Sequence, residues 1–228
     1  MKKDREQTMH KHVTLHKQVV LVLAAIFTVA SPLTLGMSPA TLGFSTPLHG
    51  AALRGDVLEA EELLAAGAAI DARDPWGRTP LHEAARCGKA RFVEFLLSHR
   101  ADQNAQDKDD LTPLHLAAET AAPDVTKLLL AYGANKDPRD HAGETPLHYA
   151  AERASDTTVC TLLEAGAHSD PKSDAGKTPL YLASRWGRVD TMRKLLACGA
   201  DTEARTDNGD SLFTAQHASK RYAQHAHC

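Results

Sequence analysis

The tetrapeptide Thr-Pro-Leu-His returns along the chain at a fixed interval of 33 residues. It begins at Thr46, Thr79, Thr112 and Thr145, and the variant Thr-Pro-Leu-Tyr begins at Thr178. No residue is inserted or deleted between these copies, and a degraded sixth copy begins at Ser211. A fixed period of this length is typical of a solenoid, in which each unit buries its apolar face only against its neighbours.

The interval divides most of the chain into five units, numbered here one to five. Their ranges are 42–74, 75–107, 108–140, 141–173 and 174–206. Residues 207–228 are predicted to form a degenerate C-terminal capping repeat and a tail.

Unit two shows which structure each unit is predicted to form. Thr79 can cap a helix, and Pro80 suits the first helical position, where no backbone donor is needed. An apolar stripe that includes Leu81 and two alanines follows, and Gly88 ends the helix. A second apolar stripe, Phe92–Leu97, predicts a second helix, and polar turn residues then lead into the next unit. The sequence therefore predicts an all-α chain of helix, turn, helix and hairpin loop, repeated.

These features resemble the ankyrin repeat family. The resemblance rests on the Thr-Pro-Leu-His copies, the Leu-Leu pairs, the alanine pairs 84–85, 117–118 and 150–151, and the Gly-Ala pairs 67–68, 133–134, 166–167 and 199–200. It covers about Leu42–Arg205 and extends weakly to the C-terminus. It implies a solenoid of stacked antiparallel helix pairs with β-hairpin-like loops, curved so that one face is concave.

Six residues depart from the pattern of this family. Arg100 replaces the glycine after a second helix, Asp110 replaces a turn glycine, Ala121 and Ala154 replace glycines between helices, and Thr161 and Lys194 replace apolar core residues. We expect units three and four to be looser than the others for this reason.

The N-terminal residues predict an export signal. Five lysines and arginines lie in the first seventeen residues, before the uncharged and mostly apolar segment Val19–Ala30. A positive flank followed by a short apolar core is typical of a secretory signal peptide. Small residues would allow cleavage before Ser31, or as late as Thr41, and residues 31–41 would be a linker. The protein would then be periplasmic or secreted.

Two other interpretations of this segment remain. The apolar stretch extended to Gly36 has eighteen residues, just enough for an uncleaved membrane anchor, although Pro32 weakens that version. A buried helix of the fold is the other alternative. Contact with a membrane is expected only through this segment, if it stays uncleaved.

Charge argues against nucleic acid as a partner. The formal net charge is −3, and without the first seventeen residues it is −6, because 21 basic and 27 acidic side chains remain. A surface of that sign repels phosphate backbones. The sequence also contains no Gly-rich phosphate loop, paired catalytic carboxylate or Cys-x-x-Cys motif, so we predict no catalytic residues, no cofactor and no enzymatic activity.

Histidine and cysteine do not predict a metal site or a disulfide framework. His49, His82, His115 and His148 recur one unit apart, and the resemblance implies that each imidazole bonds the backbone of a hairpin. Ligands one unit apart are too distant to share a metal. Cys87, Cys160, Cys198 and Cys228 occupy unrelated positions, of which only Cys160 and Cys198 could approach each other.

The terminal His225, His227 and Cys228 could bind a transition metal, although a solvated tail is the favoured interpretation. They support an alternative function, in which the protein is an accessory of an enzyme or metal-handling pathway.

The predicted function is the binding of another protein, whose identity the sequence does not reveal. In the family, partners contact hairpin tips and exposed residues of the first helices on the concave face. Carried over by register, these are Arg73, Trp76, Arg78, Arg86, Glu119, Arg139, His141, Glu144, Arg153, Lys177, Arg185 and Trp186. Both tryptophans of the chain belong to this set, and Trp and Arg are enriched among the residues that dominate binding energies.

Overall fold

A computed structural model describes residues 46–153 and 155–211. In this part of the chain each unit contributes two helices. The first helices are α2 (Pro47–Arg54), α4 (Pro80–Arg86), α6 (Pro113–Glu119), α8 (Pro146–Arg153) and α10 (Pro179–Arg185). The second helices are α3 (Val57–Ala65), α5 (Ala90–Ser98), α7 (Pro123–Ala131), α9 (Asp156–Glu164) and α11 (Val189–Ala197).

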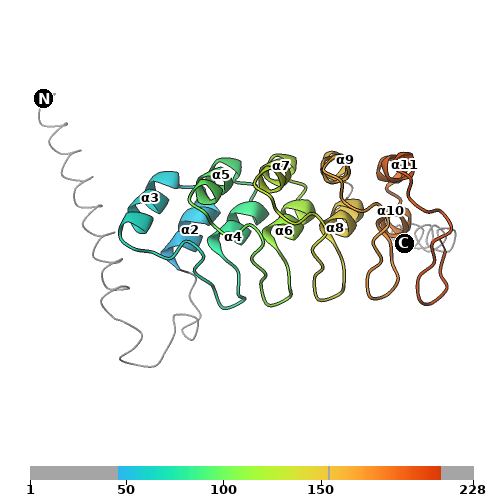
Figure 1. Ribbon diagram of the computed structural model, residues 1–228, viewed down its shortest axis with the longest axis horizontal. Helices are drawn as coiled ribbons and strands as arrows, with labels where there is room; N and C mark the ends of the chain where they lie inside the picture. The colour runs from blue at the N-terminus through green and yellow to red at the C-terminus, as the bar shows by residue number, and fades with distance from the viewer. Residues whose placement is uncertain (1–45, 154, 212–228) are drawn as a thin grey trace, which may run out of the picture.

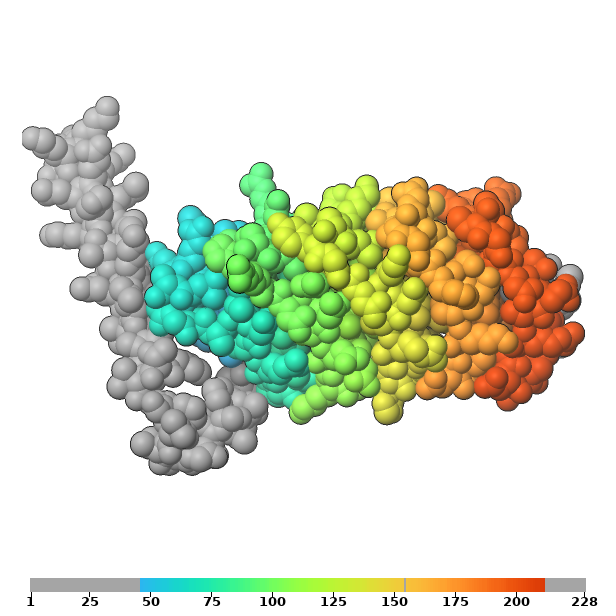
Figure 2. Space-filling view, in the orientation of Figure 1, coloured from blue at the N-terminus to red at the C-terminus, as the bar shows by residue number. Residues whose placement is uncertain are grey.

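The helices form two parallel rows (Figure 1). The first helices make one row and the second helices the other, while the hairpin loops project from the first row, away from the second. In the space-filling view of Figure 2 the units follow one another as bands along the molecule. No strand occurs in the described residues, so the predicted all-α repeat solenoid is confirmed.

The core runs the length of the stack between the two rows. Leucines one unit apart fill it from both sides: Leu48, Leu81, Leu114, Leu147 and Leu180 from the first helices, and Leu63, Leu96, Leu129, Leu162 and Leu195 from the second. The paired alanines between them are also buried, and small side chains let neighbouring helices approach closely. Each helix touches its partner within the unit and the equivalent helix of the next unit.

Each hairpin is closed by a side chain at its first corner. The Asp74 carboxylate accepts hydrogen bonds from the backbone N–H groups of Trp76 and Arg78, at 2.9 and 2.8 Å. Asp107 and Asp140 close the next two hairpins in the same way. Neighbouring hairpins are joined by single backbone hydrogen bonds, such as the 2.9 Å bond that the Lys108 N–H donates to the Trp76 carbonyl.

The recurring histidines hold consecutive units together, as the resemblance implied. In unit two the His82 Nε2–H donates to the Leu111 carbonyl of the next hairpin at 2.9 Å, and Nδ1 accepts the Thr79 backbone N–H at 3.1 Å. His115 and His148 repeat both bonds. Since Nε2 must carry the proton to donate to a carbonyl, the imidazole is the neutral Nε2–H tautomer.

Three of the departures from the family pattern adopt the backbone conformation of the glycine they replace. Arg100, Asp110 and Ala121 have φ of 66°, 61° and 56° and are the non-glycine residues with positive φ in the described part of the chain. Left-handed backbone is unfavourable for residues with a Cβ, least so for Asp. The three lie between the end of α5 and the end of the turn that follows α6.

The two departures in the second helices retain polar partners. Thr161 is buried, and its hydroxyl donates to the Thr157 carbonyl at 2.8 Å. The Lys194 ammonium donates to the Cys160 sulfur at 3.5 Å. Ala154 lies outside the described residues, and the expected looseness of units three and four stays a prediction.

The signal peptide predicted at 1–30 and the linker at 31–41 lie outside the described residues, as do residues 212–228 of the capping repeat and tail predicted at 207–228. The unit boundaries stay predictions. Within the described residues no helix is long and apolar enough to cross a membrane. Cys87, Cys160 and Cys198 are free thiols.

Candidate binding surface

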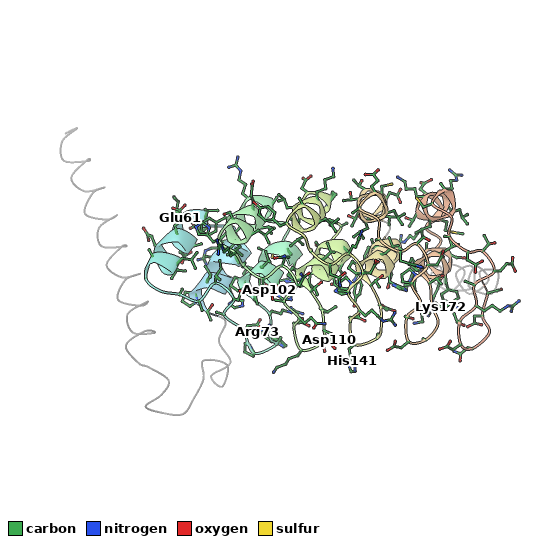
Figure 3. The ribbon with its side chains drawn as sticks, viewed as in Figure 1. Glu61, Arg73, Asp102, Asp110, His141 and Lys172 are labelled. Atoms are coloured by element: carbon green, nitrogen blue, oxygen red, sulfur yellow. The ribbon has the colours of Figure 1, made fainter. Side chains whose placement is uncertain are left out.

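The predicted binding residues lie on the hairpins and at the C-terminal ends of the first helices, a surface that we call the hairpin face. Side chains connect its two parts: Arg78 of a hairpin lies 3.7 Å from Glu83 of α4, and the Tyr149 hydroxyl of α8 reaches the hairpin residue Asp140. Figure 3 shows how Arg73, Asp110, His141 and Lys172 follow one another along the hairpins. The position of each residue within its 33-residue unit determines which side chains of the same and adjacent units it contacts.

In unit two the charged residues neutralise one another. Glu83 accepts from Arg86 at 2.7 Å, and Arg78 lies 3.3 Å from the buried carboxylate of Asp107 in the next hairpin. The hydrogen bond to Glu83 raises the pKa of Arg86 above its ordinary value. Arg78 therefore joins consecutive hairpins in addition to its predicted role, whereas Arg86 pairs within α4.

Other predicted residues join neighbouring units at the surface. Arg139 donates to the Lys172 carbonyl and to Asp174, both at 2.9 Å, and Arg153 donates to Glu119 at 2.8 Å. Arg73 donates to the Gly77 carbonyl of its own hairpin at 2.7 Å and also to the Gln106 carbonyl, one unit further along. Exposed pairs of this kind contribute about 0–1 kcal/mol each, so a partner can displace them at little cost.

The carboxylate of Asp140, the last residue of unit three, organises the surface of unit four. One of its oxygens accepts from the Ala142 and Glu144 backbone N–H groups, and the other accepts from the Tyr149 hydroxyl at 2.6 Å. Burial, followed by this hydrogen bond, holds the pKa of Tyr149 above its usual range. Burial and the nearby Asp140 raise the pKa of Glu144.

The two tryptophans are exposed in units two and five, far apart along the array. Trp76, at a hairpin tip, is 59% exposed, and Trp186, which follows α10, is 50% exposed. His141 is an exposed hairpin residue whose backbone N–H donates to the Asp109 carbonyl. The structure thus spreads the predicted residues along the stack and does not gather them into one pocket.

Sequence reasoning missed Glu83 and Tyr149. Both directly follow a recurring histidine, at the position that Leu116 and Leu182 fill in other units. Their side chains make the contacts between a first helix and a hairpin described above. The 33-residue interval could have identified them, because this position changes from Gly in unit one to Glu, Leu, Tyr and Leu in units two to five, while the alanine that follows it stays constant.

The described residues offer no cluster of side chains suited to holding a metal ion. No three His, Cys, Asp or Glu side chains among them are placed to hold a metal ion. Both ring nitrogens of His82, His115 and His148 are used in hydrogen bonds within the stack. The terminal His225, His227 and Cys228 lie outside the described residues.

Comparison with protein families agrees with this architecture. A model of ankyrin repeats in three copies matches residues 48–140, 93–173 and 135–206, which together span 48–206. A search of curated proteins found no match. Ankyrin repeats are generally scaffolds for protein–protein interaction and are typically non-catalytic. The chain belongs to the ankyrin repeat family.

Proposed function

We propose that this protein is a non-catalytic scaffold that binds another protein through the hairpin face, and that it is exported to the periplasm or secreted. The family supports the general role, and the charged N-terminal flank followed by Val19–Ala30 supports export. A protein is the proposed partner because ankyrin repeats generally mediate protein–protein binding, and the net charge of −6 beyond the first seventeen residues disfavours nucleic acid.

The observation that carries this proposal is the exposure of side chains that the fold does not require. Trp76 and Trp186 are large, half or more exposed, and occupy positions that vary from unit to unit. A tryptophan in contact with water forgoes the burial that its area offers. Trp at variable positions of a rigid surface is typical of a residue that becomes buried in a complex.

Affinity capture with variants tests the binding face. Trp76→Ala combined with Trp186→Ala should weaken capture of the principal partner at least about tenfold, since binding-site tryptophans commonly contribute about 2 kcal/mol or more. Tyr132→Ala is the matched control, because Tyr132 is an exposed aromatic residue at the end of α7, a second helix. Undiminished capture by the double variant would contradict the assignment of this face.

N-terminal sequencing of the protein purified from its compartment tests export. A new N-terminus at Ser31 or Thr41 is expected. An intact N-terminus at Met1, or at Met9 if the chain starts at this second methionine before the apolar segment, would contradict cleavage.

A further inference from the structure

The charge on the hairpin face is balanced within unit two but not within units four and five. Arg78, Glu83 and Arg86 of unit two pair with one another or with Asp107. Two further acidic side chains of this face, Glu119 and Asp174, each have an arginine within 2.9 Å. Glu144 of unit four has no ion pair among the described residues.

The environment of the Glu144 carboxylate also disfavours its negative charge. It is half-buried, and the acidic groups that act on it are Asp140 of its own hairpin and Glu152 of α8. Lys177, in the next hairpin, is the cation that acts on it, but the two do not come within ion-pair distance. Burial of a carboxylate without a counter-charge is unfavourable, and a cation from outside would relieve it.

Tyr149 lies beside this site as a fixed aromatic ring. Its hydroxyl is held by Asp140 at 2.6 Å, and its ring meets the His115 ring edge-on, with centroids 5.5 Å apart. An aromatic ring held in this way loses little conformational entropy when a ligand binds. Rings of this kind attract Lys and Arg through cation–π interaction.

Unit five presents the opposite charge. Lys177 occupies in unit five the position of Glu144 in unit four, and Arg185 occupies the position of Glu152. Neither side chain has an ion-pair partner in the described part of the chain. Trp186 follows Arg185 and is half exposed. Acidic and basic positions therefore lie side by side in adjacent units, each without a full counter-charge.

We propose that the partner protein presents a lysine or arginine side chain to Tyr149 and Glu144 and an acidic side chain to Lys177 and Arg185. This inference rests on the proposed function and adds the chemistry and the direction of the bound segment. The partner's cation would supply the charge that Glu144 lacks, and its acidic group would do the same for unit five. Complementary charges of this kind fix register and exclude wrong partners.

Selection from a random peptide library, displayed on phage, tests the inference while the natural partner is still unidentified. The wild-type chain should enrich peptides that carry Lys or Arg and, a few residues away, Asp or Glu. A synthetic copy of an enriched peptide is then titrated against four chains by calorimetry: wild type, Glu144→Gln, Lys177→Gln and Glu61→Gln.

Glu144→Gln should weaken binding of this peptide at least about tenfold, because the peptide's cation loses the negative charge with which it pairs. Replacing the peptide's basic residue by glutamine should weaken wild-type binding by more than it weakens Glu144→Gln binding, because in that variant only the contact with the Tyr149 ring is left to lose. Lys177→Gln should also weaken binding of the peptide, and replacing the peptide's acidic residue should then weaken Lys177→Gln binding less than it weakens wild-type binding. Glu61 is an exposed carboxylate of α3, labelled in Figure 3, and Glu61→Gln should bind as wild type does.

Two results would overturn the inference, and they differ in what they imply for the proposed function. If the enriched peptides show no charge preference but lose binding in Trp186→Ala, the hairpin face binds and the proposed chemistry is wrong. If they bind every hairpin-face variant as tightly as wild type, both proposals fail. Thermal unfolding of each variant establishes that a loss of binding is not a loss of fold.

Discussion

His82, His115 and His148 each connect a first helix to the hairpin of the next unit through a neutral imidazole. Burial lowers the pKa of all three, and that of His148 falls to about 4. Protonation would place a proton on Nδ1, which in the folded protein accepts a backbone N–H. Acid therefore opposes the contact that joins consecutive units.

The first prediction concerns stability against pH. Because the folded pKa lies below the unfolded value of 6.5, stability should be complete above about pH 6.5 and decline as pH falls toward 4. For His148 alone, the difference between the unfolded and folded pKa corresponds to about 3 kcal/mol of unfolding free energy. Urea unfolding at a series of pH values measures it, and His148→Gln should flatten the decline. A variant that declines as steeply as wild type would contradict this account.

The second prediction concerns the strained backbone at Ala121. A left-handed residue with a Cβ costs about 1–2 kcal/mol, while glycine costs about 0.5–1 kcal/mol in entropy. Ala121→Gly should therefore raise the free energy of unfolding by about 0.5–1 kcal/mol. Gly88→Ala is the reciprocal control, since Gly88 is equivalent, has φ of 64° and leaves room for a Cβ. If Ala121→Gly lowers the free energy of unfolding, the left-handed backbone of Ala121 is not what destabilises the folded chain at this site.

At the scale of single residues, the sequence predicts backbone conformation better than it predicts side-chain contacts. Register alone placed Arg100, Asp110 and Ala121 at glycine positions, and their positive φ confirms it. It did not predict that Glu83 would bind Arg86, or Tyr149 Asp140, because a long side chain has several rotamers and neighbours from other elements decide among them.

The helices are short, and their stability depends on packing across units. Helices of seven to nine residues are below the length at which isolated helices form in water. Prolines and threonines at the start of each first helix fix where it begins, so these boundaries follow from sequence. Which neighbour covers each helix follows from the repeat, since each unit buries its apolar face against the next.

The third prediction tests this dependence in α7. Leu129 is fully buried in the core between the two rows of helices, so Leu129→Ala should cost about 2–5 kcal/mol of unfolding free energy. Lys127→Ala, on the exposed side of the same helix, should change it by less than about 0.5 kcal/mol. Denaturant titration compares the two. Equal effects would mean that α7 is not held by its core face.

In the described part of the chain the units form a line, and the main contacts of each helix are with its own and adjacent units. Such a stack presents a long, rigid surface whose shape depends on the constant residues and whose chemistry depends on the variable ones. The fold of this array could be predicted from the sequence because one pattern is repeated. The binding chemistry could be predicted only as a set of positions, because charge balance at Glu144 depends on which side chains of neighbouring units pair with one another.

Hydrogen exchange on the complex with a captured partner tests the central claim most directly. The account predicts slower exchange in the hairpins and at the ends of first helices, most strongly at 139–153 and 177–186, with unchanged exchange in the second helices 123–131 and 156–164. Protection confined to the second helices, with exchange in the hairpins as in the free protein, would contradict the claim that this protein binds through its hairpin face.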